Sequence, residues 1–192
     1  MDVLAVLPGI EAVPAALIDP EKFAAFVRRN RDHLAEYLPA VAAFHTAEAA
    51  RDDFASVAEP IARHELWEWL LVTGGELCGA VRLNRVEHEN KKVAVAYYLG
   101  VEFRGRGIAT AAARAAVIYA FDTLGMNRIE LRCVVTNVAS VRVAERVEFI
   151  RQGELREAEF LAGRYHNHYV FGLLRSECDS ARSPKLVGDR LS

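Results

Sequence analysis

The chain has 192 residues, 52% hydrophobic and 26% charged, which is enough for one domain with a substantial core. Its formal net charge of −2 provides no overall field that favours nucleic acid or anionic lipid. The three cysteines, Cys78, Cys133 and Cys178, include no C-x-x-C pair, so neither a disulfide framework nor a zinc site is indicated. The apolar start carries Asp2 and Glu11 without a basic region, which argues against a signal peptide, and no apolar run reaches the roughly 18 residues of a membrane span. We therefore expect a cytoplasmic protein with no metal, nucleic-acid or membrane partner.

The first half of the chain predicts helices followed by an antiparallel meander. In chain order we expect a weak strand at 10–18, a helix opening at Asp19-Pro20, helices at 32–37 and 46–63, and strands at 65–72, 77–86 and 93–99. The residues Thr73-Gly74-Gly75-Glu76 between the first two strands of the meander are typical of a hairpin turn.

The second half predicts a strand–helix–strand crossover and a closing hairpin. Its expected elements are a helix at 105–124 ended by Gly125, a strand at 128–135, a helix at 137–147 with Asn137 as N-cap, and strands at 148–156 and 165–175. This order indicates an α/β protein with a mixed α+β sheet. The chain after Ser176 is polar and rich in turn residues, so we predict a single domain over residues 1–177 and a loose tail over 178–192.

An alternating Arg-Gly segment, Arg104–Gly107, stands at the start of the predicted 105–124 helix. A helix N-terminus presents unpaired N–H groups and the positive end of the helix dipole, which favour phosphate. The glycines let the backbone approach phosphate oxygens and form a nest of donors, and the arginines add charge-assisted bonds. An ordinary tight turn with two exposed arginines is the simpler alternative.

Two other phosphate-binding motifs fit this loop less well. A Rossmann fingerprint would need glycine at Thr110, and its acidic ribose ligand would be Glu130, which lies early in its strand. A Walker loop would need G-K-[ST], which is absent from the sequence. A Rossmann oxidoreductase that binds NAD therefore remains only as an alternative.

The segment Arg104-Gly105-Arg106-Gly107-Ile108-Ala109 matches [Q/R]-x-x-G-x-[G/A], the signature of GNAT acetyltransferases. The segments "NRDHLAEYLP", "NRIELRCVVTNVASVRVAERVEF" and "GELREAEFLAGRYHNHYVFGLLRSE" resemble its RimJ/RimL-type branch, whose members modify ribosomal-protein N-termini. The resemblance covers about residues 10–177. It implies the GNAT (acyl-CoA N-acyltransferase) fold, a mixed central sheet flanked by helices, and transfer of an acetyl group from acetyl-CoA to a primary amine.

The same resemblance implies where coenzyme A binds. The loop would cradle its pyrophosphate, and the end of the preceding strand would pair with the pantetheine arm and offer an N–H to the oxyanion. The cofactor-binding residues expected on this basis are Tyr98, Leu99, Val101, Arg104, Gly105, Arg106, Gly107, Ile108, Ala109, Thr110 and Asn137. No metal is expected.

Two catalytic residues are also implied by the resemblance. Ser140, in the first turn of the helix capped by Asn137, would protonate the departing thiolate, as the serine at this position does in the RimJ/RimL-type branch. The tyrosine that serves as the acid in many other family members is replaced here by Ala144. Glu159 matches a position with an acid–base role in the branch, whereas the glutamate usual on the third strand of the meander is replaced by Ala94. The plainer alternatives are a routine polar residue at Ser140 and a solvated hairpin charge at Glu159, and Glu157 is a second carboxylate candidate.

The sequence leaves the acceptor open among protein N-termini, small amines and amine-bearing antibiotics. A GNAT-like module that binds CoA or a partner without turnover is the main alternative, because Ala94 removes the usual carboxylate. The oligomeric state is not readable, although the branch is often dimeric, so a homodimer is one expectation.

Four further positions carry expectations that the structure can test. Trp67 and Trp69 share one face of a strand and belong either to an acceptor cleft or to the core, and Arg82 is expected to be a solvated strand end. Glu148 stands where Rim-like sequences have glycine, and a left-handed conformation there would cost about 1–2 kcal/mol.

Overall fold

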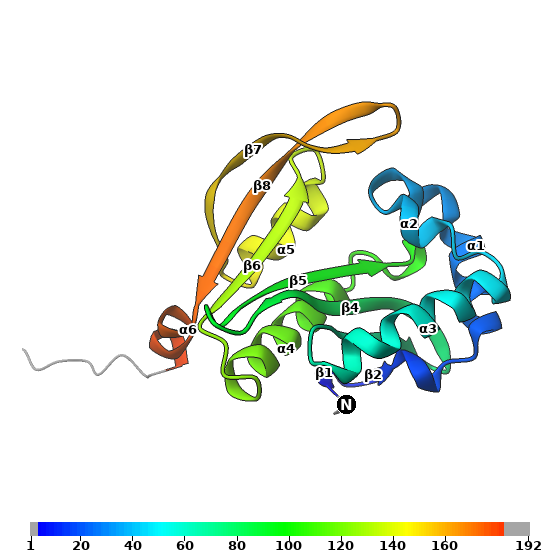
Figure 1. Ribbon diagram of the computed structural model, residues 1–192, viewed down its shortest axis with the longest axis horizontal. Coiled ribbons are helices and arrows are strands. Elements are labelled where there is room, and N and C mark those ends of the chain that lie inside the picture. Colours follow the sequence, from blue (N-terminus) through cyan, green and yellow to red (C-terminus); the bar gives the residue numbers. More distant parts are fainter. Residues whose placement is uncertain (1–3, 183–192) are drawn as a thin grey trace, which may run out of the picture.

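The computed structural model describes residues 4–182, which form one twisted mixed sheet with helices on both faces (Figure 1). Within these residues the sheet has eight strands in the order β1-β2-β3-β4-β5-β6-β8-β7. The strands are β1 (Leu4–Leu7), β2 (Ile10–Pro14), β3 (Trp67–Thr73), β4 (Glu76–Glu87), β5 (Lys92–Leu99), β6 (Arg128–Val134), β7 (Ile150–Leu161) and β8 (Arg164–Leu174). The predicted α/β class and mixed sheet are confirmed.

The predicted antiparallel meander is formed by β3, β4 and β5, and its first turn is the expected hairpin at Gly74-Gly75. The chain then crosses over through α4 (Ile108–Asp122) to β6, which pairs parallel with β5. All other neighbouring strands described here pair antiparallel. The β7–β8 hairpin extends as a long arm beyond β6 (Figure 1).

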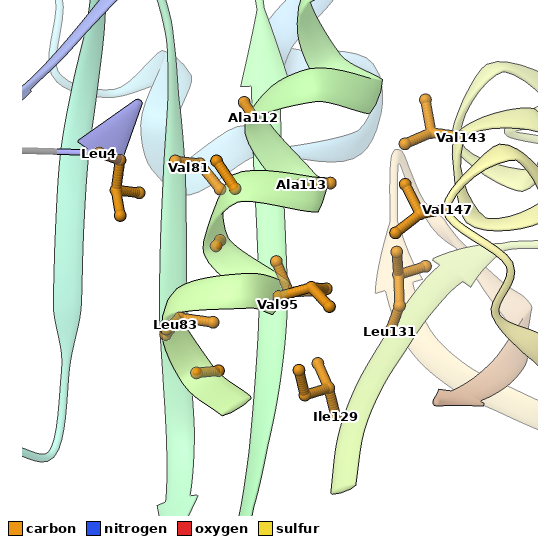
Figure 2. Packing of buried hydrophobic residues seen from close by; sticks show 14 of the residues in the cluster. Leu4, Val81, Leu83, Val95, Ala112, Ala113, Ile129, Leu131, Val143 and Val147 are labelled. Atoms are coloured by element: carbon orange, nitrogen blue, oxygen red, sulfur yellow. The ribbon is translucent and has the colours of Figure 1, made fainter. Parts of the chain in front are cut away.

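Helices α4 and α5 (Val138–Arg146) contribute to the larger of the two apolar clusters of the core. Figure 2 shows Ala112 and Ala113 of α4 near Val81 and Val95 of the sheet, where small side chains permit close helix–sheet packing. Trp69 is fully buried in this cluster and meets Tyr119 edge-on at 5.2 Å between ring centroids. Both tryptophans are therefore core residues.

The opposite face of the sheet is covered by α1 (Pro20–Tyr37) and α3 (Ala47–Ala62), with the short α2 (Pro39–Ala42) between them. Asp19 accepts a hydrogen bond from a backbone N–H group at the predicted helix start, and Thr46 caps α3 in the same way. The helices predicted to open at Asp19-Pro20 and to span 32–37 are in fact the single helix α1. No helix-breaking residue lies between them, and the helix ends only before Pro39.

Three other expectations need correction. The weak strand predicted at 10–18 ends at Pro14, where a 3-10 turn over Ala15–Leu17 follows, and the β1 strand before it was not predicted. The strand predicted at 148–156 continues to Leu161 because a bulge lets β7 follow β8. The predicted tail begins inside α6 (Arg175–Arg182), where Cys178 packs against the core, and residues 183–192 lie outside the described part.

None of the helices within residues 4–182 combines the length and apolar character needed to cross a membrane.

Glu148 has φ = 72°, in the left-handed region that follows the end of α5. Phe149 N donates to Ala144 O at 3.0 Å, so the chain closes this helix with the turn that usually takes glycine. The expected left-handed geometry is confirmed.

We predict that Glu148→Gly raises the free energy of unfolding by a few tenths to about 1 kcal/mol, because relief of the left-handed strain exceeds the added flexibility of the unfolded chain. Thermal or urea unfolding measures the change. Glu145→Gly is the matched control, since Glu145 lies inside α5 and glycine there should destabilise by about 1 kcal/mol. A lower melting temperature for Glu148→Gly would contradict this account of the helix end.

Candidate active site

Strands β5 and β6 pair over only three residues, Lys92–Ala94 against Arg128–Glu130, and then separate. A cavity of about 330 Å³ lies where they part. Its lining comes from the α1 side of the sheet, the end of β5, the Arg-Gly loop and the start of α5: His33, Leu34, Glu36, Tyr37, Leu38, Tyr97, Tyr98, Leu99, Arg104, Ala109, Thr136, Asn137, Val138, Ala139, Ser140 and Val143. The cavity is thus bounded by helices from both faces of the sheet.

The end of β5 offers backbone groups to this cavity. Gly100 N donates to Cys78 O of β4 at 2.9 Å, so strand alternation turns the backbone groups of Tyr97 and Leu99 toward the opening. Val101 N is already bonded to Asn30 Oδ1 at 2.8 Å. Among the three expected strand residues, Leu99 is therefore the one whose N–H faces the opening.

Asn30 is a buried residue of α1 that sequence reasoning did not single out. Its side-chain oxygen accepts from Val101 N, and its Nδ2 donates to Phe26 O at 3.1 Å. The amide therefore ties α1 to the start of the loop. A contact across 71 residues leaves no local signal in the sequence.

The Arg-Gly loop has the conformation that its glycines predict. Gly105 and Gly107 have φ = 75° and 76°, and Gly107 is the N-cap of α4 without any side-chain cap. The first intrahelical bond runs from Ala111 N to Gly107 O, so the N–H groups over 108–110 precede it and are available to an anion.

The two arginines of the loop face different hollows. Arg104 lines the main cavity, whereas Arg106 lies over the Phe103 ring, 5.5 Å from its centroid, and lines a second hollow of about 630 Å³ along α4. Gly105, Gly107 and Thr110 also line the second hollow. The loop therefore separates the two hollows and presents positive charge to each.

Ser140 is placed at the wall of the main cavity by the capped start of α5. Asn137 Oδ1 accepts from Ser140 N at 3.1 Å, which confirms the predicted N-cap. Ser140 Oγ lies 3.0 Å from the hydroxyl oxygen of Tyr97, which also donates to Ser140 O at 3.3 Å. Burial raises the pKa of Tyr97 despite this hydrogen bond, so the phenol keeps its proton. Tyr97 was not among the expected site residues.

Two further titratable groups stand close to Ser140 or Arg104. Burial raises the pKa of the Cys133 thiol, and a hydrogen bond with Ser140 opposes that shift, so the thiol is neutral at pH 7. Burial and the charge of Arg104 lower the pKa of His33, which lines the cavity. Its imidazole is therefore neutral at pH 7 and able to accept a proton.

Glu159 lies on the β7 arm rather than in the cavity wall. Its Oε2 is 3.0 Å from His168 Nε2, and His168 faces Val134 at the end of β6. The β-bulge of β7 that precedes Glu159 is stabilised by Asn167, whose Oδ1 accepts a hydrogen bond from Glu157 N at 2.9 Å. Glu159 and His168 thus lie on the β7–β8 hairpin, where β8 pairs with the end of β6.

The position of the missing family glutamate, Ala94, is flanked by Asn84 on β4 and Glu130 on β6. Glu130 is buried, with Arg132 at 2.6 Å and Arg128 at 3.6 Å. Glu130 is paired with these two arginines and does not line the cavity, so it does not take the place of that glutamate in the cavity wall. Within residues 4–182, no group of His, Cys, Asp and Glu side chains is arranged to hold a metal ion.

A model of the acetyltransferase (GNAT) domain family matches residues 14–150. The chain belongs to this family. It is 29% identical over 169 residues to YdaF of Bacillus subtilis (strain 168), which is named as a ribosomal N-acetyltransferase, with 85% of this chain and 90% of that protein covered. It is 36% identical over 90 residues to the ribosomal-protein-serine acetyltransferase of Escherichia coli (strain K12), covering 47% of this chain and 50% of that protein.

The fold also matches a solved structure of RimL, a ribosomal L7/L12 alpha-N-protein acetyltransferase in complex with coenzyme A. The TM-score is 0.83 at 23% identity, with 92% of this chain and 99% of that chain covered. The GNAT fold expected from the sequence is confirmed, and the protein is an acetyl-CoA-dependent N-acetyltransferase.

We predict that Gly107→Val abolishes the thermal stabilisation that CoA gives, because a β-branched residue resists φ = 76° and would distort the amide nest. A thermal shift titration with CoA measures the loss. Gly75→Val is the matched control, because Gly75 has φ = 82° in a distant hairpin and its replacement should lower stability without changing CoA affinity. An unchanged CoA affinity in Gly107→Val would show that the loop does not hold the pyrophosphate.

Proposed function

We propose that this enzyme is cytoplasmic and acetylates the N-terminal amine of a protein or peptide, with acetyl-CoA lying in the opening between β5 and β6. The names of YdaF and of the serine acetyltransferase of Escherichia coli support a ribosomal protein as the acceptor. The observation that carries the proposal is the cavity that joins the Arg-Gly loop to α1, with Ser140 and Tyr97 in its wall.

In this proposal the pyrophosphate, the pantetheine arm and the thioester of acetyl-CoA each bind to a different part of the site. The pyrophosphate lies on the N–H groups over 108–110, with Arg104 and Arg106 adding charge from either side. The pantetheine arm pairs with the open edge of β5 at Tyr97 and Leu99, as an added strand does. The N–H of Leu99 then reaches the thioester oxygen and stabilises its negative charge as the amine attacks. Asn137 acts indirectly, because it holds Ser140.

The reaction requires a proton for the thiolate that leaves. We propose that Ser140 Oγ–H donates this proton to the CoA sulfur as the C–S bond breaks. Tyr97 stays protonated in the buried site and stabilises the serine oxygen through a hydrogen bond, so the two hydroxyls act as one relay, and the serine regains its proton from solvent. The 3.0 Å contact between the two hydroxyls is short enough for such a relay.

The attacking amine must lose a proton, and two groups could accept it. Glu159 is the candidate from the sequence, with His168 beside it to hold its orientation. His33 is the second candidate, because it lines the cavity itself and is neutral at pH 7. Both could also act through a water molecule, so their roles are best separated by pH dependence.

The acceptor is tested by following thiol release from acetyl-CoA in the presence of short peptides with free N-termini, and by mass spectrometry of the peptides. Peptides with a blocked N-terminus and no other amine are the control. Turnover of free peptides alone supports the proposal. Binding of CoA without turnover of any amine would instead support a CoA-binding module.

We predict that Ser140→Ala lowers kcat about 10- to 100-fold with little change in the KM for acetyl-CoA, because the proton transfer is made only in the transition state. Tyr97→Phe should lower kcat less, and the double variant should be no worse than Ser140→Ala alone, since both act in one relay. Steady-state kinetics with one peptide measures these effects. If the two effects multiply in the double variant, the relay is wrong.

We predict that the acceptor of the amine proton can be identified from kcat/KM against pH. If Glu159 is the base, Glu159→Gln loses most activity at neutral pH and recovers partly as pH rises and more amine becomes neutral unaided. His33→Gln should then keep the wild-type profile. If His33 is the base, the acid limb of the wild-type profile lies below pH ~6.5, because the pKa of His33 is lowered, and His33→Gln removes that limb. If kcat/KM of Glu159→Gln depends on pH as that of the wild type does, Glu159 is not the base.

A further inference from the structure

A second charged cluster lies on the α1/α3 face of the sheet, outside the cavity wall. Arg82 of β4 donates to Glu68 of β3 through Nε at 3.0 Å and Nη2 at 2.6 Å. Both bonds go to Glu68 Oε1. The sequence-based expectation that Arg82 is a solvated strand end is therefore wrong, because its cross-strand partner is a buried carboxylate.

The cluster carries more negative charge than Arg82 alone can balance. The Glu68 side chain is only 4% exposed, and its Oε2 has no hydrogen-bond partner. Asp53 of α3 adds a second carboxylate, and burial together with the charge of Glu68 raises the pKa of Asp53 to about 6. At pH 8 the two carboxylates face the single guanidinium of Arg82. An unpartnered carboxylate oxygen in a buried site costs stability, which natural proteins tolerate mainly where function requires it.

The cluster is connected to the cavity across the sheet. Glu68, Arg82 and Ala96 are direct cross-strand neighbours on β3, β4 and β5, so they form one line on the same face. Ala96 is exposed and Arg82 is partly exposed, which leaves this line open to solvent at the β5 end. Tyr98, which lines the cavity, is close enough for Glu68 and Arg82 to affect its pKa. Two strand spacings put Glu68 about 10 Å from the open edge of β5.

We propose that the cluster of Asp53, Glu68 and Arg82 binds a second cationic group of the acceptor, an ammonium or guanidinium about 10 Å from the amine that is acetylated. A cation there would supply the missing partner of Glu68 Oε2 and balance the charge of Asp53. The inference rests on the proposed function, since it assigns a feature of the acceptor. A Lys or Arg side chain a few residues from a peptide N-terminus has this chemistry, and so does a linear diamine.

The experiment compares matched acceptors at pH 8, where Asp53 is ionised. One arm uses two peptides that differ only in Lys or Nε-acetyl-lysine at the third residue, and the other uses 1,6-diaminohexane and hexylamine. We expect the wild type to prefer the dicationic member of at least one arm by about tenfold in kcat/KM. A preference in the peptide arm identifies a basic side chain as the source, and one in the amine arm alone identifies a diamine.

Asp53→Asn should reduce this preference to less than about threefold, because Glu68 and Arg82 then balance each other. Asp52→Asn is the matched control: it removes the same charge from the neighbouring, exposed position of α3 and should leave the preference unchanged. Melting temperatures of both variants verify folding. No preference in either arm, or the same preference in Asp53→Asn as in the wild type, would overturn the proposal.

A binding measurement separates this inference from the proposed function. In the presence of CoA, 1,6-diaminohexane should raise the melting temperature of the wild type more than hexylamine does, and the difference should disappear in Asp53→Asn. If no amine is acetylated, the proposed function is wrong, yet this difference still decides whether the cation site exists. Equal stabilisation by the two amines in the wild type would refute the site.

Discussion

The function we propose depends on two parallel strands, β5 and β6, that pair for three residues and then separate. Adjacent strands normally satisfy each other's backbone groups, and within residues 4–182 the pairing of β5 with β6 ends at Ala94. In the proposed function this opening supplies acetyl-CoA with an edge for its amide chain and an N–H for its thioester oxygen. The Arg-Gly loop follows the end of the same strand, so under the proposal one separation of strands sets the position of both the pyrophosphate and the reacting carbonyl.

Contacts around this opening bring together the residues to which we assign catalytic and positioning roles. Tyr97 comes from β5 and Ser140 from the helix that follows β6, and their hydroxyls meet at 3.0 Å. On the other face, Asn30 secures the start of the loop to α1, the helix that also contributes His33. The row of cross-strand neighbours Glu68, Arg82 and Ala96 places buried negative charge near the open edge of β5. We propose that this charge attracts a second cationic group of the acceptor.

Local chemistry made much of this architecture predictable. The caps at Asp19, Thr46 and Asn137 and the left-handed Glu148 follow from neighbouring residues alone, and so does the left-handed backbone of the two loop glycines. The contacts of Tyr97 and Asn30 span 43 and 71 residues, so only the assembled sheet brings their partners together. Arg82 was misjudged for the same reason, since an arginine in an alternating strand gives no sign of the carboxylate opposite.

The central claim is that acetyl-CoA occupies the opening between β5 and β6 with its pyrophosphate on the start of α4. Amide hydrogen exchange followed by NMR, with and without CoA, tests this directly. The account predicts slowed exchange at the N–H groups of Leu99, Ile108, Ala109 and Thr110, because the ligand becomes their partner, and little change at Val101, which Asn30 already holds. Protection confined to other parts of the sheet, with those four amides unchanged, would contradict it.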